Sequence, residues 1–248
     1  MNKNSQVQSL RDRLKNIAKL EGKPIASVVT DFLIERMVCR LTSNSILATH
    51  IVFKGGYVGI RCYQSPRYTV DLDVIAHKRD EEEVIELAKL SMKEPMDDLV
   101  WFQLEKEIDL TTQGNYGGTC LQYRAGIGKK PDDTRRSQIL KVDIGVGDPV
   151  TPGPVKSFLE CKVEGGVAAW QVYPIETIVA EKIHCLIARG ASNSRSKDIF
   201  DLAFYCPKCE PHTLRKALIA TFSHRGDDLP QDLYETIRVL ETDVLQRG

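Results

Sequence analysis

The sequence predicts an α+β fold in which a mixed sheet follows an N-terminal helical arm and precedes a mostly helical C-terminal lobe. Apolar residues recur at every third or fourth position over residues 1–43, which is the spacing of one helical face. Alternating apolar and polar residues occupy much of 51–146, as in half-buried strands. Helical spacing returns after Pro174. We therefore expect residues 1–150 to hold the arm and the sheet, and residues 151–248 to form the C-terminal lobe.

The individual elements follow from local signals. The first helix is expected to end at Gly22, and Pro24 can take the first position of a second helix. A charged helix is expected at residues 80–92, and polar, glycine-containing loops at 111–118 and 128–137 indicate hairpins. The five expected strands are residues 51–53, 68–75, 100–110, 120–126 and 139–146.

The charge balance and the cysteines limit the class of protein. Lys and Arg number 34 and Asp and Glu number 34, so no net charge attracts nucleic acid or a membrane surface. Any contact with nucleic acid must therefore be local. Seven cysteines are scattered, unlike the framework of a small secreted domain. No stretch approaches the roughly 18 apolar residues of a membrane span. These features favour a cytoplasmic protein without a membrane partner.

A Gly-Gly pair precedes two acids that are spaced one residue apart. In an extended strand Asp71 and Asp73 share one face while Leu72 and its apolar neighbours occupy the other, with the acids roughly 7 Å apart at their Cα atoms. Two such charges are costly unless hard cations such as Mg²⁺ or Mn²⁺ bind them. Gly55 and Gly56 can expose backbone N–H groups to a triphosphate at the start of a helix. The layout is typical of metal-dependent nucleotidyl transfer; a tight turn and a solvated strand face are the alternatives.

A third acid lies on the strand expected at residues 139–146. Period two places Leu140 and Val142 on the core face, so Lys141 and Asp143 share the opposite face. A neighbouring strand could deliver Asp143 beside the first two acids, where it would bind metal or help to deprotonate an attacking hydroxyl. A surface Lys/Asp pair on a half-exposed strand is the alternative.

The first C-terminal helix carries a lysine within its apolar stripe. Lys182 must reach solvent or face a carboxylate or phosphate, because a buried ammonium without an anion is costly. His184 projects to the opposite face and is expected to be solvent-exposed. We expect Lys182→Met to leave folding nearly intact while activity falls. The next loop and helix carry Arg195, Lys197 and Asp198, a candidate clamp for a base and phosphates, although ordinary capping explains part of this pattern.

The chain resembles the AbiEii-type nucleotidyltransferase toxins, relatives of the DNA polymerase β nucleotidyltransferase superfamily, in five segments that occur in order. These segments are FKGG, RYTVDLD, LKVDIG, ETIVAEKIH and NSRSKDIFDL. The resemblance covers nearly the whole chain, and the ordered set is more specific than any one motif. It implies a mixed-sheet nucleotidyltransferase core and a C-terminal lobe that completes the active site.

The resemblance also implies roles for individual residues. The candidate catalytic residues are Asp71, Asp73, Asp143, Lys182 and Asp198, of which the first three are the metal-binding acids. The candidate nucleotide-binding residues are Gly55, Gly56, Thr69, Lys141, Lys182, Arg195 and Lys197. Asp201 also falls in the last motif. Tyr57 departs from the pattern, because relatives commonly have Ser or Thr after the Gly pair, and a hydroxyl contact to the phosphates is therefore in doubt.

We expect an enzyme that transfers a nucleoside monophosphate from an NTP to an acceptor hydroxyl with Mg²⁺ or Mn²⁺. The resemblance implies the toxin of a toxin–antitoxin or abortive-infection system, partnered by an antitoxin or transcriptional regulator, with RNA as acceptor and the 3′ end of tRNA as the first candidate. The basic residues 129–136 are a candidate local contact to RNA. A non-catalytic nucleotide- or antitoxin-binding module and a small-molecule nucleotidyltransferase are the alternatives. Cys206, Cys209 and His212 resemble half of a zinc site and lack a second ligand pair.

Overall fold

The computed structural model describes residues 2–110, 117–163, 165–190 and 196–245. The chain divides into two compact units, which we name the sheet unit and the helical unit. The sheet unit comprises Met1–Cys62, Pro66–Gly147 and Lys156–Gln171. The helical unit comprises Tyr63–Ser65, Asp148–Val155 and Val172–Gly248.

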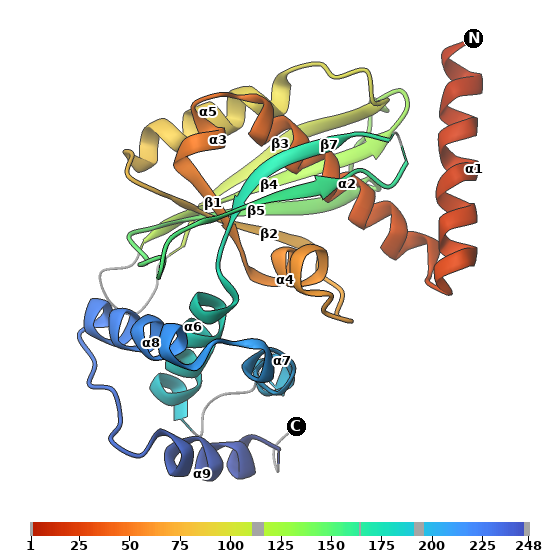
Figure 1. Cartoon of the computed structure of the whole chain (residues 1–248). Coiled ribbons are helices and arrows are strands. Elements are labelled where there is room, and N and C mark those ends of the chain that lie inside the picture. Colours follow the sequence, from red (N-terminus) through yellow and green to blue (C-terminus); the bar gives the residue numbers. More distant parts are fainter. Residues whose placement is uncertain (1, 111–116, 164, 191–195, 246–248) are drawn as a thin grey trace. The chain divides into compact units, whose positions relative to one another are not determined.

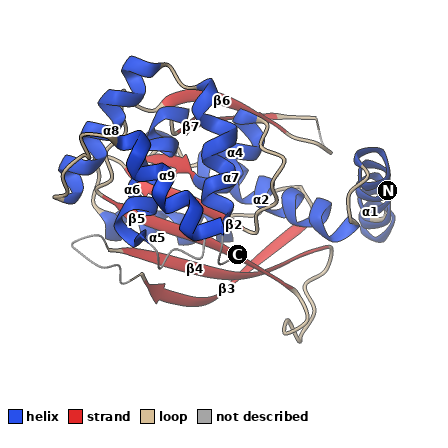
Figure 2. Cartoon of the chain, turned by 90° about the horizontal axis from the view of Figure 1, so that it is seen from below, coloured by secondary structure: helices blue, strands red, loops and turns tan. Residues whose placement is uncertain are grey.

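A mixed sheet of seven strands, counted over the described residues, confirms the predicted fold class. Its order is β3-β4-β5-β2-β1-β7-β6, and Figure 2 shows β3 and β4 toward one edge and β7 and β6 toward the other. β2 runs parallel to β5 and antiparallel to β1, whereas β3, β4 and β5 pair as antiparallel hairpin neighbours. The strands are β1 (Ile51–Lys54), β2 (Asp71–Ala76), β3 (Val100–Asp109), β4 (Gly118–Ile127), β5 (Gln138–Val146), β6 (Val155–Glu160) and β7 (Val167–Val172).

Two of these strands, β6 and β7, were not expected from the sequence. β6 lies at the edge of the sheet, where Leu159 is buried while Phe158 is 71% exposed, so its residues lack a clear alternation. β2 also begins three residues later than predicted. The hydroxyl of Thr69 accepts a hydrogen bond from the backbone N–H of Asp71 at 3.4 Å, a local turn that precedes the strand.

The helices of the sheet unit are α1 (Lys3–Glu21), α2 (Ile25–Ser43), α3 (Leu47–His50), α4 (Gly55–Tyr63) and α5 (Glu81–Lys93). α1 ends where the sequence predicted, because Gly22 adopts a φ of 63° and closes the last turn. Figure 1 shows α5 beside α3, and α1 at the N-terminal end of α2.

α2 is more deeply buried than a helix with a single apolar face. Arg40 is 2% exposed, and its guanidinium donates two hydrogen bonds to Asp98, at 2.6 and 2.9 Å. Glu35 is fully buried between Arg36 and Arg61. Each of these charges has a partner, which is the condition for burying it without a large desolvation cost. α2 therefore belongs to the core of the sheet unit.

The helical unit contains α6 (Ile175–Arg189), α7 (Ser196–Tyr205), a 3₁₀ turn (Cys206–Lys208), α8 (Pro211–Arg225) and α9 (Leu233–Leu245). α7, α8 and α9 all contact α6. The expectation that His184 is exposed was wrong, because α8 covers this face of α6. His184 is 5% exposed, lies against Phe222 and shares a 2.7 Å hydrogen bond with Asp227. In the described part of the chain, no helix combines the length and apolar character that crossing a membrane would need.

Candidate active site

The three acids that the sequence singled out lie on two neighbouring strands. In the parallel register of β2 and β5, Asp73 is directly opposite Asp143 and Asp71 is opposite Lys141. The alternation along both strands follows the predicted pattern, since Leu72, Val142 and their apolar neighbours are buried on the other face. The strand pairing therefore brings two separate sequence motifs to one patch of the sheet.

Gly55 holds a position that no other residue could occupy in this structure. Its φ is 69°, and a Cβ atom placed there would lie 1.8 Å from Oδ2 of Asp73. The carboxylate of Asp73 thus packs directly against the backbone at the start of α4. The glycine that the sequence suggested as a phosphate-binding turn also makes room for one of the acids.

Gly56 plays a similar part toward Thr69. A Cβ atom at Gly56 would lie 3.2 Å from both Cβ and Oγ1 of Thr69, which is tighter than ordinary packing. Thr69 in turn hydrogen-bonds the backbone of Asp71 through its hydroxyl. The Gly-Gly pair, Thr69 and the two strand acids therefore form one closely packed group in the sheet unit.

The sequence did not indicate that Cys120 belongs to this group. Cys120 on β4 is directly opposite Asp143 on β5 and is 4% exposed. Burial raises the pKa of Cys120 to about 12, and the adjacent Asp143 adds to this effect. The thiol is therefore neutral. Only the strand pairing could have revealed it, because Cys120 lies far from the acids in sequence.

The chemistry of the acids suits a magnesium–phosphate site. Oδ1 of Asp143 is buried and has no hydrogen-bond partner among the described residues, so one carboxylate oxygen remains available to a cation. No group of three or more His, Cys, Asp or Glu side chains in the described ranges is gathered closely enough to hold a metal alone. Mg²⁺ commonly takes only one or two protein carboxylates and completes its shell with water and substrate phosphates. The acids fit that pattern.

Tyr57, which follows the Gly-Gly pair, lies in the core of the sheet unit. Its side chain is fully buried, and its ring makes an edge contact with Trp170 of β7, with 6.0 Å between the centroids. The ring of Phe53 packs against the same tryptophan. Burial raises the pKa of Tyr57 well above its ordinary value. The residue that departs from the family pattern is thus a core residue of the sheet unit.

In the helical unit, Lys182 forms the ion pairs that its apolar surroundings require. Its ammonium lies 2.9 Å from Oδ1 of Asp198 and 2.7 Å from Oδ2 of Asp201, both on α7. The two carboxyl side chains are 7% and 2% exposed. Burial alone would lower the pKa of Lys182, but these carboxylates outweigh burial and raise it above its ordinary value. Of the outcomes that the sequence left open for Lys182, the structure shows carboxylate partners within this unit.

The remaining candidates of the last motif have different positions. Lys197 is exposed in the first turn of α7. Arg195 lies outside the described residues. Cys209 of the half zinc site uses its thiol to donate a hydrogen bond to the backbone carbonyl of Tyr205, at 3.5 Å.

A mixed sheet that carries an Asp-x-Asp strand after a glycine-initiated helix, with a further acid on the parallel neighbour, defines a nucleotidyltransferase class of fold. The family model described as "Nucleotidyl transferase AbiEii toxin, Type IV TA system" matches residues 36–248. The chain belongs to this family of nucleotidyltransferases, which confirms the resemblance seen in its ordered motifs.

Two solved structures are similar to this chain at low sequence identity. JHP933 from Helicobacter pylori is 19% identical, with 87% of this chain and 90% of that chain covered and a TM-score of 0.45. An antigenic nucleotidyltransferase-like protein from Paracoccidioides brasiliensis is 18% identical, with 86% and 94% covered and a TM-score of 0.47. No curated protein matches the chain.

Proposed function

We propose that this nucleotidyltransferase is metal-dependent and transfers a nucleoside monophosphate from an NTP to a hydroxyl of RNA, with release of pyrophosphate. The observation that carries the proposal is the pairing of Asp73 with Asp143 across two parallel strands, where a buried oxygen of Asp143 has no hydrogen-bond partner among the described residues. A site that only stabilised the fold would gain nothing from this arrangement. It suits a cation carried in by the substrate.

Asp71 and Asp73 would hold Mg²⁺ or Mn²⁺, with Asp143 as a further ligand. When bound, the cation supplies Lewis-acid stabilisation of charge on the phosphoryl oxygens. Gly55 and Gly56 begin α4, so the backbone N–H groups and the positive end of the helix would attract the triphosphate. Thr69 and Lys141 flank the acids and are proposed to contact the nucleotide.

In the proposed reaction, the acceptor hydroxyl oxygen forms a bond to the α-phosphorus, and the bond from that phosphorus to the bridging oxygen breaks. Pyrophosphate leaves, and the hydroxyl proton passes to a carboxylate, for which Asp143 and Asp198 are the candidates. The family motifs further support roles for Lys182, Lys197 and Arg195 in contacting phosphates. Lys182 would offset the charge that develops on the transferred group.

The acceptor is proposed to be RNA, with the 3′ end of tRNA as the first candidate. Since the net charge is zero, binding must rely on local cations such as those of residues 129–136. Part of the positive charge of that segment is already neutralised, because Arg135 pairs with Asp133 at 2.8 Å. We therefore expect RNA affinity to depend only weakly on salt, with few phosphate contacts. Membership of a type IV toxin–antitoxin family supports a toxin that acts in the cytoplasm and has a cognate antitoxin or transcriptional regulator as partner.

Incubation of the purified protein with Mg²⁺, each α-labelled NTP in turn and total RNA tests the proposal. We expect label on RNA, sensitivity to EDTA, and a loss of about 10²-fold or more in Asp71→Ala and Asp73→Ala. Asp12→Ala is the matched control, because Asp12 is an exposed acid on α1 with side-chain partners only on its own helix. This variant should retain activity.

Two other outcomes would replace the proposal. Metal-dependent binding of NTP without transfer to RNA, protein or small molecules would indicate a non-catalytic nucleotide- or antitoxin-binding module. Transfer of label to a small molecule but never to RNA would indicate a small-molecule nucleotidyltransferase.

A further inference from the structure

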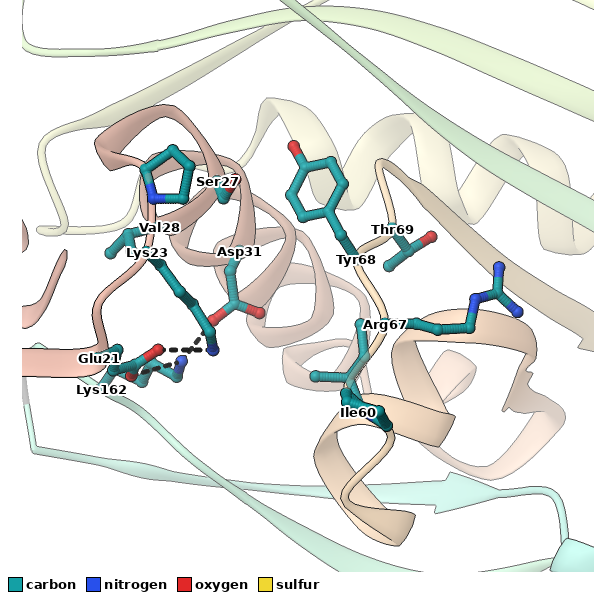
Figure 3. A pocket seen from close by; sticks show the side chains of 12 residues that line it. Glu21, Lys23, Ser27, Val28, Asp31, Ile60, Arg67, Tyr68, Thr69 and Lys162 are labelled. Atoms are coloured by element: carbon teal, nitrogen blue, oxygen red, sulfur yellow. Dashed lines mark hydrogen bonds and ion pairs between the residues drawn. The ribbon is translucent and has the colours of Figure 1, made fainter. Parts of the chain in front are cut away.

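A cavity of about 210 Å³ lies in the sheet unit, and Figure 3 shows its lining, which includes Thr69, two residues before Asp71. One wall is the segment that leads into β2, with Tyr68 and Thr69, and Ile60 of α4 lies near it. The opposite wall comes from the end of α1 and the start of α2, where Ser27 is placed. Every lining residue belongs to the sheet unit, so the cavity is complete within it.

We propose that this cavity binds a nucleobase and that the ring of Tyr68 is the surface on which the base stacks. The inference deepens the proposed function, because it assigns a base subsite to the same nucleotidyl-transfer centre. The base could belong to the incoming NTP or to the acceptor strand, and the chemistry of recognition is the same for both.

The charges of the cavity favour a neutral ligand over a phosphate chain. Lys23 pairs with Glu21 at 2.7 Å, while Lys162 pairs with Glu21 at 3.1 Å and with Asp31 at 2.9 Å. These ion pairs are drawn as dashed lines in Figure 3. Both lysines of the wall are therefore already neutralised by its carboxylates, and the side chain of Arg67, the other cation among the lining residues, extends away from this group (Figure 3). A ring that offers hydrogen-bonding edges loses less on entering such a site than a polyphosphate would.

Size and composition also favour a base. A cavity of 210 Å³ is smaller than the roughly 300–1,000 Å³ of sites that enclose a whole drug-sized ligand. Apolar surfaces from Val28, Ile60 and Tyr68 alternate with the hydroxyl groups of Ser27 and Thr69. Apolar walls with a few polar groups are the usual lining of a small-molecule site.

Tyr68 is held ready for stacking. It is 51% exposed, yet its hydroxyl donates a 2.9 Å hydrogen bond to Oγ1 of Thr30, which itself donates to the carbonyl of Ala26 at 2.8 Å. The ring is therefore tethered to α2 while much of its surface remains open. Fixing an aromatic side chain before the ligand arrives reduces the entropy lost on binding.

The position of Tyr68 links the cavity to the chemistry. Asp71 follows only three residues later, which places the two Cα atoms at most about 11 Å apart. Thr69 lines the cavity and also packs against the backbone of Gly56. The distance from a base in the cavity to Asp71 would therefore be no more than the length of one nucleotide.

The whole α1–α2 wall precedes residue 36, where the match to the family model begins. Ser27 and Asp31 are in this preceding part. The base subsite is thus partly built from residues outside the matched range, as expected for a determinant of which base this particular enzyme accepts.

Saturation-transfer difference NMR with the four ribonucleosides, each offered alone and without metal, tests the site directly. We expect saturation of the base protons of at least one nucleoside, and binding weakened about 5- to 100-fold in Tyr68→Ala, the range for loss of one base–aromatic stack. Ser27→Met should weaken binding by filling the cavity, whereas Tyr68→Phe should retain most of it. Tyr234→Ala, which removes a 78% exposed tyrosine of the helical unit, is the matched control.

Steady-state kinetics then distinguish the two sources of the base. A raised KM for NTP in Tyr68→Ala, at nearly unchanged kcat, assigns the cavity to the incoming nucleotide; a raised KM for RNA assigns it to the acceptor. The inference is overturned if no nucleoside shows saturation, or if Tyr68→Ala and Ser27→Met both bind within twofold of the parent. Because the NMR arm needs no transfer, it can succeed even if the proposed transfer to RNA fails.

Discussion

The close approach between Gly55 and Asp73 makes the first glycine of the pair the most constrained residue of the candidate site. Gly55→Ala would force its methyl group into the carboxylate of Asp73 as well as strain a backbone with φ of 69°. We expect loss of most nucleotidyl transfer and a stability loss of more than about 1 kcal/mol, measured by denaturant unfolding.

Gly22→Ala separates these two effects. Gly22 has a similar φ of 63°, but a Cβ atom there would meet nothing within 4 Å. Its substitution should cost only the backbone strain of about 1 kcal/mol and leave activity unchanged. Equal losses of activity in the two variants would contradict the steric role of Gly55.

For single residues, the sequence predicted the candidate site residues better than it predicted their contacts. Period-two alternation placed Asp71, Asp73 and Asp143 on the polar face of their strands, because that rule depends only on the backbone. It could not reveal that Cys120 lies opposite Asp143, or that Tyr57 is buried against Trp170. Those contacts depend on strand order and register, which local pattern does not encode.

The ion pairs between α6 and α7 lead to a different prediction for Lys182. The sequence suggested that Lys182→Met would leave folding nearly intact. Lys182→Met would instead remove the ammonium that pairs with the buried carboxylates of Asp198 and Asp201. We therefore expect Lys182→Met to lower the free energy of unfolding by about 3 kcal/mol, measured by urea denaturation.

Lys89→Met provides the comparison. Lys89 has a similar side-chain exposure, 15% against 20%, but its partners Glu86 and Glu107 are 67% and 43% exposed. Water can solvate those acids after the lysine is removed, so the cost should stay below about 1 kcal/mol. If both variants lose the same stability, the buried triad of the helical unit is not what makes Lys182 structurally important.

The first turn of α8 has a pH-sensitive cap. The carboxylate of Glu210 accepts hydrogen bonds from the backbone N–H groups of His212 and Thr213, at 2.9 and 2.7 Å, and from the hydroxyl of Thr213. The hydroxyl and these N–H groups lower the pKa of Glu210 to about 2 from an ordinary value of 4.5. The stabilisation is present above pH 4.5 and is lost as the pH falls toward 2.

Glu210→Gln should therefore be less stable than the parent at neutral pH, and the difference should shrink as the pH falls from 4.5 toward 2. Thermal unfolding of both proteins across this range measures it. A difference that stays constant with pH would show that the charge of Glu210 does not contribute to the cap.

Element prediction failed where burial departed from a regular pattern. β6 was missed because an edge strand with an exposed Phe158 does not alternate. α2 was recognised as a helix, yet its burial was underestimated, since Glu35 and Arg40 look like surface residues until their partners are known. The long strands β4 and β5 were predicted well because they combine length with alternation over most of their residues.

For the whole chain, the sheet is complete only when β6 and β7 are included. β7 pairs with β1, and its Trp170 contacts Phe53 and Tyr57. A truncation to residues 1–150 would expose an edge of β1 and remove that ring from the core. We expect it to lack cooperative thermal unfolding by circular dichroism, whereas residues 1–172 should unfold cooperatively. Similar cooperative transitions for both truncations would contradict this assignment of the sheet unit.

The chain crosses between the two units several times, and this limits what genetic recombination can exchange. Residues 63–65 and 148–155 belong to the helical unit, although the sheet unit continues on both sides of each segment. A single crossover between two related genes therefore cannot exchange the helical unit whole, because even a crossover after residue 171 leaves residues 63–65 and 148–155 with the sequence of the other parent. We expect the two units to share one evolutionary history, with changes in strand β7 and in helix α6 arising in the same lineages.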